Sequence, residues 1–389
     1  MGVCAIFGGT FNPPHIGHKQ IIQALNALEF IDEILVIPTK IPPHKHVADI
    51  ASEEDRLHMC ELLAADFPKA KVSNIELLRE GKSYTIDTLS ELKKLYPDKN
   101  FALTIGADML TTFETWKDYK KILSLASLIT FFRGDSDKES YNCAVKRFEG
   151  ESNNIYCVEQ EILSVSSTQV REKLSTGQSV ADVIDHTIYC YIVKNCLYGQ
   201  GEIISKFKDI IKEKLDDYRY NHSLCVADEA LRLAEKYGAD PQKAYIAGLL
   251  HDITKNYSAD EHLKFAEKFD IMFSDVEKAS PNLWHAITGS YYVLKLLNIN
   301  DPEIIGAIRY HTTGKADMCL LENLIYLADF TSADRTYRDV DEMRRLVDIS
   351  LVDATEYSLD FLVNDLARRG LTVHPDTASA YEQIKSQKS

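Results

Sequence analysis

The pattern of hydrophobic residues changes once along the chain, and this change restricts the fold more than any other feature of the sequence. From Val3 to about Leu197, short apolar runs alternate with segments whose apolar residues recur every three or four positions. Continuous apolar runs are typical of strands covered on both faces, so this order predicts βαβ units around a parallel sheet. From Ser205 onward only helical periodicity is found. We therefore expect an α/β domain with a Rossmann-like parallel sheet, followed by an all-α domain.

The 389 residues exceed what one core usually holds, which agrees with two domains. We expect domains at 1–197 and 205–389, joined by a linker at 198–204 that contains two glycines. The expected strands are 3–7, 33–39, 101–108, 127–133 and 154–160, and the expected helices of the first domain include 18–28, 53–67 and 85–96. In the second domain we expect a helix over 205–218. Asp240-Pro241 and Asp301-Pro302 each combine an N-cap with a first-turn proline, so each pair predicts a helix start.

The net charge of −15 disfavours non-specific binding to nucleic acid, which requires a basic surface. A polyanionic substrate must therefore meet a local group of cations or a metal. The eight cysteines form no C-x-x-C pair, which is typical of reduced thiols in the cytoplasm. We find no apolar run of the roughly 18 to 20 residues that span a bilayer and no signal-peptide pattern at the N-terminus, so we expect a cytoplasmic protein without membrane contact.

The run GGTFNPPHIGH, residues 8–18, is the most informative stretch of the first domain. An apolar strand ends at Gly8 and Gly9, and a helical pattern begins at about His15. A strand, a glycine turn and a helix N-terminus together make an anion site, because unpaired backbone N–H groups point toward the turn. His15 and His18 are three residues apart and share one helix face, where they can donate hydrogen bonds to a polyphosphate. The glycine pair favours this interpretation over a surface histidine pair.

This run resembles the H-x-G-H signature of the nucleotidylyltransferase superfamily, specifically the bacterial nicotinate mononucleotide adenylyltransferases. Further similar motifs follow in the same order. They are IPPHK at 41–45, SYTIDTL at 83–89, IGADML at 105–110, Trp116 with the next lysine, FFR ending at Arg133, and SVSSTQVR at 164–171. The resemblance implies that nicotinate mononucleotide attacks the α-phosphorus of ATP and that pyrophosphate leaves, with Mg²⁺ carried by ATP and no covalent enzyme intermediate.

The resemblance also implies roles for individual residues. The triphosphate and the reacting phosphates would be held by His15, His18, Lys45, Arg171, Ser167 and Thr168, next to the loop of Gly8, Gly9, Thr10 and Phe11. The nucleoside and nicotinate contacts would be Gly106, Asp108, Tyr84, Thr85, Trp116 and Arg133. A purely structural role for Trp116 as a core residue remains open. Asn12 stands where many relatives have aspartate, so we assign it no catalytic role.

The second domain contains six candidate metal ligands at or near the ends of helical patterns. They are His222, His251, Asp252, His285, His311 and Asp329. Asp252 follows a helix and so puts a negative charge at its negative pole, which is unfavourable unless a cation compensates. A mixed nitrogen and oxygen set suits Fe, Mn, Co or Zn, and no cysteine belongs to it. His262 and His374 lack comparable surroundings in the sequence.

The pattern of these residues resembles the HD-domain phosphohydrolases. RYNHS at 219–223, AGLLHDITK at 247–255, WHAITG at 284–289, YHTTG at 310–314 and LIYLAD at 324–329 are similar to the YqeK-type symmetrical diadenosine tetraphosphate hydrolases. The resemblance implies cleavage of diadenosine tetraphosphate to two ADP by one or two ions of iron or manganese, less readily zinc. Asp252 and Lys255 would be catalytic. Thr312, Thr313, Gly314 and, more weakly, Arg335 would face the nucleotide.

Other interpretations keep the folds but change the functions. The first domain could be a pantetheine-phosphate or flavin adenylyltransferase, which the motifs at 41–45, 83–89 and 105–110 disfavour. The second could act on guanosine tetraphosphate or a cyclic nucleotide, which the WHAITG and YHTTG motifs disfavour, or it could bind nucleotide without turnover. The sequence leaves homo-oligomerisation open.

Overall fold

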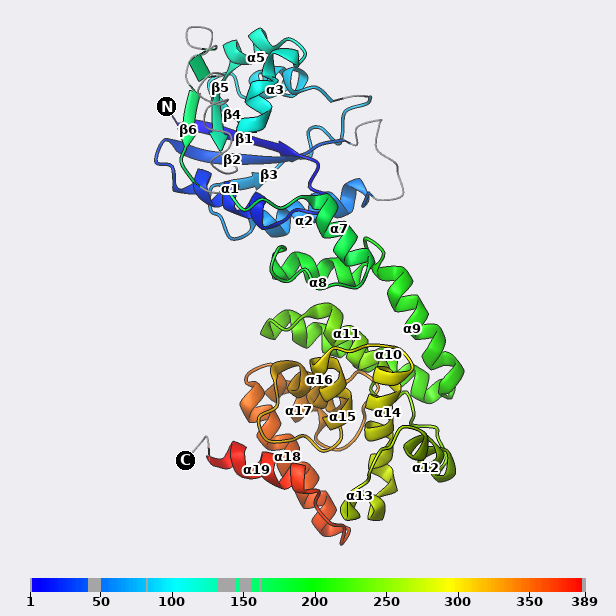
Figure 1. The fold of residues 1–389 in the computed structure, drawn as a ribbon. Coiled ribbons are helices and arrows are strands. Elements are labelled where there is room, and N and C mark those ends of the chain that lie inside the picture. The colour runs from blue at the N-terminus through cyan, green and yellow to red at the C-terminus, as the bar shows by residue number, and fades with distance from the viewer. Residues whose placement is uncertain are drawn as a thin grey trace. The chain divides into compact units, whose positions relative to one another are not determined.

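The computed structural model describes residues 2–40, 50–81, 83–131, 145–146, 148, 155–160 and 162–386. Lys45 and Arg133 lie outside these ranges, and the side chain of Asp108 is not described. The chain divides into two compact units (Figure 1). The first comprises Met1–Ile192 with Leu197–Gly199, and the second comprises Val193–Cys196 with Gln200–Ser389. Within the described ranges, no helix has the length and apolar character needed to span a membrane.

The first unit is built on a six-stranded parallel sheet with the order β3-β2-β1-β4-β5-β6. The strands are β1 Val3–Gly9, β2 Ile31–Pro38, β3 Ala70–Val72, β4 Asn100–Gly106, β5 Ala126–Phe131 and β6 Ile155–Val158. The expected parallel sheet is confirmed, although the three-residue edge strand β3 was not predicted. The strand order changes direction between β1 and β4, and ligands of open α/β sheets bind outside the carboxyl ends of the strands at such a point.

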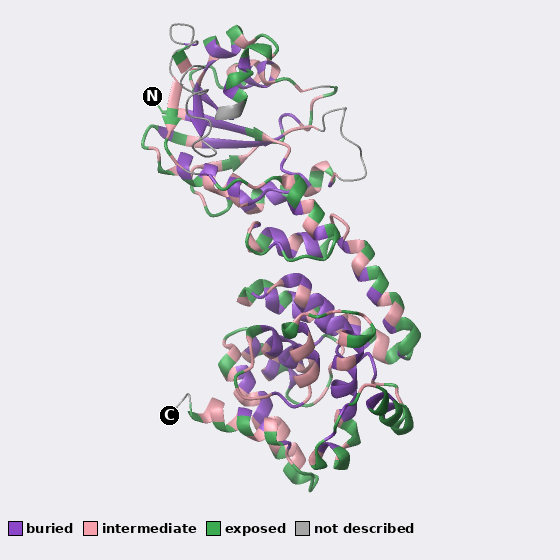
Figure 2. Ribbon diagram, in the orientation of Figure 1, coloured by how far each residue is buried: buried purple, intermediate pink, exposed green. Residues whose placement is uncertain are grey.

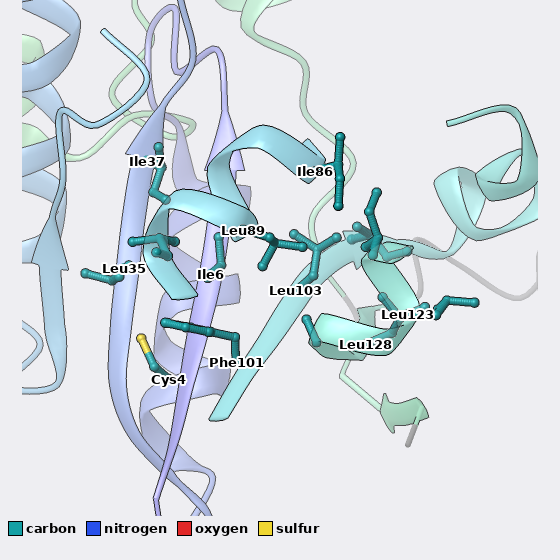
Figure 3. Close-up of a cluster of buried hydrophobic side chains, with 14 of the residues drawn as sticks. Cys4, Ile6, Leu35, Ile37, Ile86, Leu89, Phe101, Leu103, Leu123 and Leu128 are labelled. Atoms are coloured by element: carbon teal, nitrogen blue, oxygen red, sulfur yellow. The ribbon is translucent and has the colours of Figure 1, made fainter. Parts of the chain in front are cut away.

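Helices cover both faces of this sheet. They are α1 Ile16–Ala27, α2 Glu53–Ala64, α3 Thr85–Leu95, α4 Ala107–Thr111, the turn η2 Phe113–Thr115, α5 Tyr119–Leu125, α7 Ser167–Ser175 and α8 His186–Lys194. On one face, apolar side chains of α3 and α5, including Leu89 and Leu123, pack on Ile6 and Leu103 of the sheet (Figure 3). Burial on both faces explains why β1, β2, β4 and β5 have continuous apolar runs; Figure 2 shows the central residues of these strands in purple.

The second unit is helical, and its described residues 200–386 contain no strand. Its elements are α9 Gln200–Lys214, α10 Asp217–Tyr237, α11 Pro241–Leu250, α12 Ala259–Lys268, α13 Asp275–Ala279, the turn η4 Pro281–Leu283, α14 Trp284–Lys295, α15 Pro302–Tyr310, α16 Leu320–Thr331, α17 Val340–Val347, α18 Leu351–Arg368 and α19 Pro375–Ser386. The expected all-α architecture is therefore confirmed.

Side-chain caps explain several helix boundaries of this unit. Asp240 and Asp301 accept hydrogen bonds from the backbone N–H groups of the following turn, so α11 and α15 begin at their prolines as predicted. The prediction of one helix over 205–218 was wrong, because α9 ends at Lys214 and Asp216 caps a new helix by accepting from the N–H of Arg219. Residues 200–204 of the expected linker belong to α9.

Candidate active sites

The signature loop of the first unit joins β1 to α1 at the switch point of the sheet. His15 is the N-cap of α1, and its backbone N–H donates to Nδ1 of His18 over 3.1 Å. The two ring centroids lie 3.7 Å apart, so the structure brings the pair together as predicted from spacing. Because Nδ1 of His18 accepts a hydrogen bond, the neutral ring carries its proton on Nε2. His18 can therefore offer an N–H donor to a ligand.

Gly17, between the two histidines, allows the chain before α7 to approach this loop. A Cβ atom on Gly17 would lie 3.1 Å from the carbonyl oxygen of Leu163 and 3.2 Å from the ring of His15. Few real Cβ contacts are that short, so the glycine of the H-x-G-H motif has a packing reason at this position.

The N-terminal turn of α7 is tied to the signature loop by two hydrogen bonds. The hydroxyl of Ser167 donates to the carbonyl of Pro13 over 2.9 Å, and Nη1 of Arg171 donates to the carbonyl of Asn12 over 2.8 Å. Nη2 of Arg171 lies 3.4 Å from the hydroxyl of Thr168. Motifs about 150 residues apart thus meet beside one helix N-terminus, which is a suitable place for phosphate.

Asn12, Tyr198 and Arg56 hold the signature loop in place through hydrogen bonds. The side-chain oxygen of Asn12 accepts from the N–H of Ala51 over 3.1 Å and from the hydroxyl of Tyr198 over 2.9 Å. Arg56 is fully buried and donates from Nη1 to the carbonyls of Thr10 and Thr39 over 2.9 and 2.8 Å. Sequence reasoning did not identify Tyr198 or Arg56. A charged residue inside the apolar pattern of 53–67 was the available signal for Arg56.

The residues expected near the pyridine ring lie on the α3 and α5 side of the sheet. Tyr84 is exposed, with Nζ of Lys117 4.2 Å from its ring centroid, and Thr85 is the first residue of α3. Trp116 packs against the core with its ring 5.1 Å from that of Phe113, which is the structural role that the sequence left open. Gly106 ends β4 and precedes α4, which contains Asp108.

All six candidate metal ligands of the second unit converge in its interior. His222 lies on α10, His251 and Asp252 follow α11, His285 lies on α14, His311 follows α15, and Asp329 lies on α16. They form three overlapping groups, and within each group the ligand atoms lie within 4.8 Å of one another. The sequence spacing therefore predicted a set of residues that the fold does bring together.

The histidines at two helix ends are held in the orientation and protonation state that a metal requires. Nδ1 of His251 lies 2.7 Å from the carbonyl of Gly248, and Nδ1 of His311 lies 2.7 Å from that of Ile308. Each Nδ1–H donates to a carbonyl, so the lone pair is on Nε2. Among the described residues, Nε2 of His251 and Oδ1 of Asp252 are buried without a hydrogen-bond partner, and the charged contacts of Oδ1, to His285, His311 and Lys255, are 3.2 Å or longer. Buried acceptors that lack a hydrogen bond are costly, and a divalent cation would satisfy both, so these residues fit a metal ion.

The pKa shifts of the candidate ligands also agree with a metal site. Burial, outweighing the opposite effect of Asp252, lowers the pKa of His251 to about 4, and burial also holds the pKa of His285 well below its ordinary value. Burial would raise the pKa of Asp252, but the nearby His251, His311, His285 and Lys255 hold it well below the usual range. At neutral pH the site thus presents the Asp252 carboxylate and the neutral imidazoles of His251 and His285, which are electron-pair donors. His222 differs, because burial lowers its pKa but the hydrogen bond and charge of Asp329 outweigh burial and raise it.

Arginine and lysine side chains lie beside this cluster. They supply the local group of cations that a polyanionic substrate would need on a chain that is acidic overall. Nη1 of Arg219 lies 3.2 Å from Oδ2 of Asp252, and Nζ of Lys255 lies 3.6 Å from Oδ1 of Asp252 and 2.9 Å from Nε2 of His285. Arg335 pairs with Asp329. Arg219 was missed, although its position three residues before His222 places both on one face of α10.

Other residues near the cluster have structural partners. Asp334, also missed, lies 2.7 Å from Nδ1 of His222 through its Oδ2 and orients that ring. The hydroxyl of Thr313 donates to the carbonyl of Gly314, which has a positive φ of 62°. Thr312 is the exception, because its hydroxyl oxygen is buried and has no hydrogen-bond partner in the described part of the chain.

The geometry defines two classes of protein in one chain. The first unit is a doubly wound α/β fold with the signature loop at its switch point, and the second is a helical unit with an interior cluster of histidines and aspartates that could hold a metal ion. The cytidylyltransferase-like family matches residues 6–173, and the HD domain family matches residues 219–334.

Similar proteins cover the two halves separately. The "Probable nicotinate-nucleotide adenylyltransferase" of Geobacillus thermodenitrificans is 34% identical over 200 residues, 51% of this chain and 87% of that protein. The symmetrical bis(5'-nucleosyl)-tetraphosphatase of Bacillus subtilis is 36% identical over 176 residues, 45% of this chain and 94% of that protein. A solved structure, described as a predicted HD superfamily hydrolase involved in NAD metabolism from Clostridium acetobutylicum, is 33% identical with a TM-score of 0.46, covering 47% of this chain and 97% of its own.

The chain therefore belongs to the nicotinate-nucleotide adenylyltransferases through its first half and to the HD-domain symmetrical bis(5'-nucleosyl)-tetraphosphatases through its second half. Both family resemblances inferred from the motifs are confirmed.

Proposed function

We propose that the chain is a bifunctional enzyme. Its first unit transfers AMP from ATP to nicotinate mononucleotide, and its second unit hydrolyses diadenosine tetraphosphate symmetrically to two ADP. The observation that carries the proposal is the interior cluster of six histidines and aspartates, because Nε2 of His251 and Oδ1 of Asp252 are buried there without a hydrogen-bond partner among the described residues and a divalent ion would satisfy both. The first activity rests on the signature loop, its bonds to α7 and the 34% identity to an adenylyltransferase over most of that protein's length.

In the first unit, a phosphate oxygen of nicotinate mononucleotide forms a bond to the α-phosphorus of ATP. The bond between the α-phosphorus and the bridging oxygen breaks, and pyrophosphate leaves with Mg²⁺. His15 and His18 stabilise the charge on the triphosphate, with Lys45 as a further cation. Ser167 and Arg171 hold the loop against α7, so that the reactants are positioned before reaction.

In the second unit, the six clustered residues would hold one or two divalent ions, and the resemblance to the YqeK-type hydrolases favours iron or manganese over zinc. Such an ion, when bound, neutralises phosphate charge and makes water more acidic. Asp252 is the acidic residue common to two of the three ligand groups. Lys255 and Arg219 are placed to bind the phosphate chain, because each lies within 3.6 Å of the Asp252 carboxylate. Water adds to one central phosphorus, the central phosphoanhydride breaks, and two ADP result.

Product analysis tests both halves of the proposal. The full chain, loaded anaerobically with Fe²⁺ or Mn²⁺, is incubated with diadenosine tetraphosphate, and the nucleotides are separated by chromatography. We expect ADP alone. AMP with ATP, or no turnover by metal-replete protein, would contradict the hydrolase assignment, and binding without turnover would indicate a regulatory unit.

Two variants test the activities of the two units independently. Asp252→Ala should abolish ADP formation and leave adenylyl transfer from MgATP to nicotinate mononucleotide intact. His18→Ala should do the reverse. If either variant lost both activities while remaining folded, the assignment of one site to each unit would be wrong.

A further inference from the structure

A cleft of about 420 Å³ adjoins the metal cluster of the second unit. Arg219, Lys255 and His285 line it and also contact Asp252. The rest of its lining includes Tyr257, His262, Asn282 and Trp284, which belong to neither the metal set nor the phosphate-binding cations. Its volume lies at the lower end of the range of about 300 to 1,000 Å³ for small-molecule sites, which suits one nucleotide better than a whole dinucleotide.

Within this cleft, no feature of the sequence indicates a functional role for His262. It lies on α12 with only 5% of its surface exposed. Its Nδ1 lies 2.9 Å from the hydroxyl of Thr288, which in turn lies 2.9 Å from the hydroxyl of Thr254. The hydroxyl of Thr254 donates to the carbonyl of His285 over 2.9 Å. A continuous chain of hydrogen bonds therefore runs from His262 to the backbone of a candidate metal ligand.

The number of available protons favours one tautomer of His262. The hydroxyls of Thr254 and Thr288 contact each other and the carbonyls of His285 and Trp284, and either hydroxyl can be the donor between them, so their two protons do not suffice for these contacts and the contact to His262 as well. A proton on Nδ1 of His262 supplies a third donor, which the Thr288 oxygen accepts. Burial, with Lys255 nearby and only partly opposed by Glu261, lowers the pKa of His262 and keeps the ring neutral. Its Nε2 is consequently a hydrogen-bond acceptor.

Nε2 is also the nitrogen that a ligand can reach. It has no hydrogen-bond partner among the described residues and is not one of the buried unpaired atoms, so it is solvent accessible, and the residue lines the cleft. The ring is held between Tyr257 and Trp284, with centroid distances of 5.5 and 6.1 Å. A neutral acceptor repels phosphate oxygens, which bind instead at Arg219 and Lys255. The group that meets His262 must carry an N–H or O–H donor.

We propose that His262 determines nucleoside specificity by accepting a hydrogen bond from the nucleoside of the nucleotide half bound in this cleft. The donor is the amino group of adenine or a hydroxyl of ribose, and both offer the same chemistry to Nε2. The proposal rests on the proposed hydrolase function, because that function supplies a nucleotide to the cleft.

Product inhibition tests this role on the metal-loaded full chain. ADP, 2'-deoxy-ADP, 3'-deoxy-ADP and purine riboside diphosphate, which lacks the amino group, are compared as inhibitors of diadenosine tetraphosphate hydrolysis. Inhibition of this reaction reports only the second unit, whereas total binding would include the ATP site of the first. We expect one analogue to inhibit about 2- to 12-fold more weakly than ADP, the value of one net hydrogen bond. That analogue identifies the donor.

The variant His262→Phe keeps a ring and removes the acceptor. ADP and that analogue should therefore inhibit this variant about equally, so that the ratio of their inhibition constants is about one. Leu263→Ala, at the neighbouring and 48% exposed position, should leave the ratio as in the wild type. An unchanged ratio in His262→Phe, or equal inhibition by all four compounds in the wild type, would overturn the proposal. If His262→Phe does not fold, a crystal structure of the wild type with ADP decides, because Nε2 must lie within about 3.2 Å of a nucleoside donor.

The two proposals fail in different ways. A metal-loaded protein that releases no ADP from diadenosine tetraphosphate contradicts the hydrolase function. In that case calorimetric titration with ADP and the three analogues is compared between wild type and His262→Phe. Because the first unit is the same in both proteins, the difference between them measures the specificity of the cleft. Turnover to ADP without dependence on His262 contradicts the specificity role alone.

Discussion

Gly248 sets how closely α11 packs against α10, and this spacing controls both the stability and the metal site of the second unit. A Cβ atom at position 248 would lie 2.7 Å from Cα of Ala227, 3.0 Å from its backbone nitrogen and 3.1 Å from the carbonyl oxygen of Val226. Carbon atoms in contact prefer about 3.5 to 4.0 Å. The clashing atoms belong to the helix backbone and cannot rotate away, so Gly248→Ala must push the two helices apart by roughly 1 Å.

The expected cost can be estimated from this displacement. Overpacking a core typically costs about 1 to 3 kcal/mol, against which alanine recovers up to about 1 kcal/mol through its better helix propensity. A net loss of about 1 to 2 kcal/mol lowers the melting temperature of a unit this large by about 2 to 8 °C. His251 follows three residues later and donates to the Gly248 carbonyl, so the shift also moves a candidate ligand. We expect metal affinity to fall by about tenfold or more.

Differential scanning calorimetry of the full chain, with and without metal, measures the first effect, and metal titration measures the second. Gly289→Ala is the matched control, because it also adds a methyl group to a buried helical glycine near the cluster. Its Cβ would meet nothing closer than 3.5 Å, so we expect equal or higher stability. Adenylyl transfer should be unchanged in both variants. A Gly248→Ala protein as stable as the wild type, or an equal loss in Gly289→Ala, would refute the reasoning.

Three further perturbations test other parts of the structure. Asp334→Asn weakens the orientation of His222 and should lower metal affinity about 10- to 100-fold, measured by titration, while the metal-free protein stays folded. Tyr198→Phe removes one hydrogen bond to Asn12, so adenylyl transfer should lose about 2- to 12-fold in kcat/KM and hydrolysis should not change. Burial raises the pKa of Asp185, but its hydrogen bonds to a lysine and a threonine outweigh this and lower it. Its contribution is therefore fully present above pH 3.8 and is lost as the pH falls through the lowered folded-state pKa, so Asp185→Asn should cost about 1 kcal/mol at pH 7 and progressively less as the pH falls below 3.8, measured by urea unfolding.

The architecture could be predicted because its causes are local. The apolar runs of the sheet and the Asp-Pro helix starts each depend on a few adjacent residues, and both were correctly identified. The helix over 205–218 was predicted wrongly for a related reason. Its apolar periodicity continues through the boundary, and only the bond from the Asp216 side chain to the Arg219 N–H shows that one helix ends and another begins.

The candidate sites were predictable where one motif carries the chemistry. The pair His15 and His18, and the adjacent His251 and Asp252, are close in the sequence and needed no knowledge of the fold. Arg56 was missed because its partners are backbone carbonyls 17 and 46 residues away, which no motif records. Asp334 was missed because it orients a histidine 112 positions earlier in the chain.

His262 shows most clearly why such residues escape sequence reasoning. A histidine on the buried side of an amphipathic helix is ordinarily a core residue, and the sequence around position 262 says nothing else. Its chemistry depends on which nitrogen is protonated, and this depends on the hydroxyl groups of Thr288 and Thr254, 26 and 8 residues away, which also contact backbone carbonyls of α14. Both threonines lie within the motifs WHAITG and AGLLHDITK, but neither motif indicates a contact with position 262. The hydrogen bonds of the folded core, rather than any pattern along the chain, therefore make His262 an acceptor beside Arg219 and Lys255.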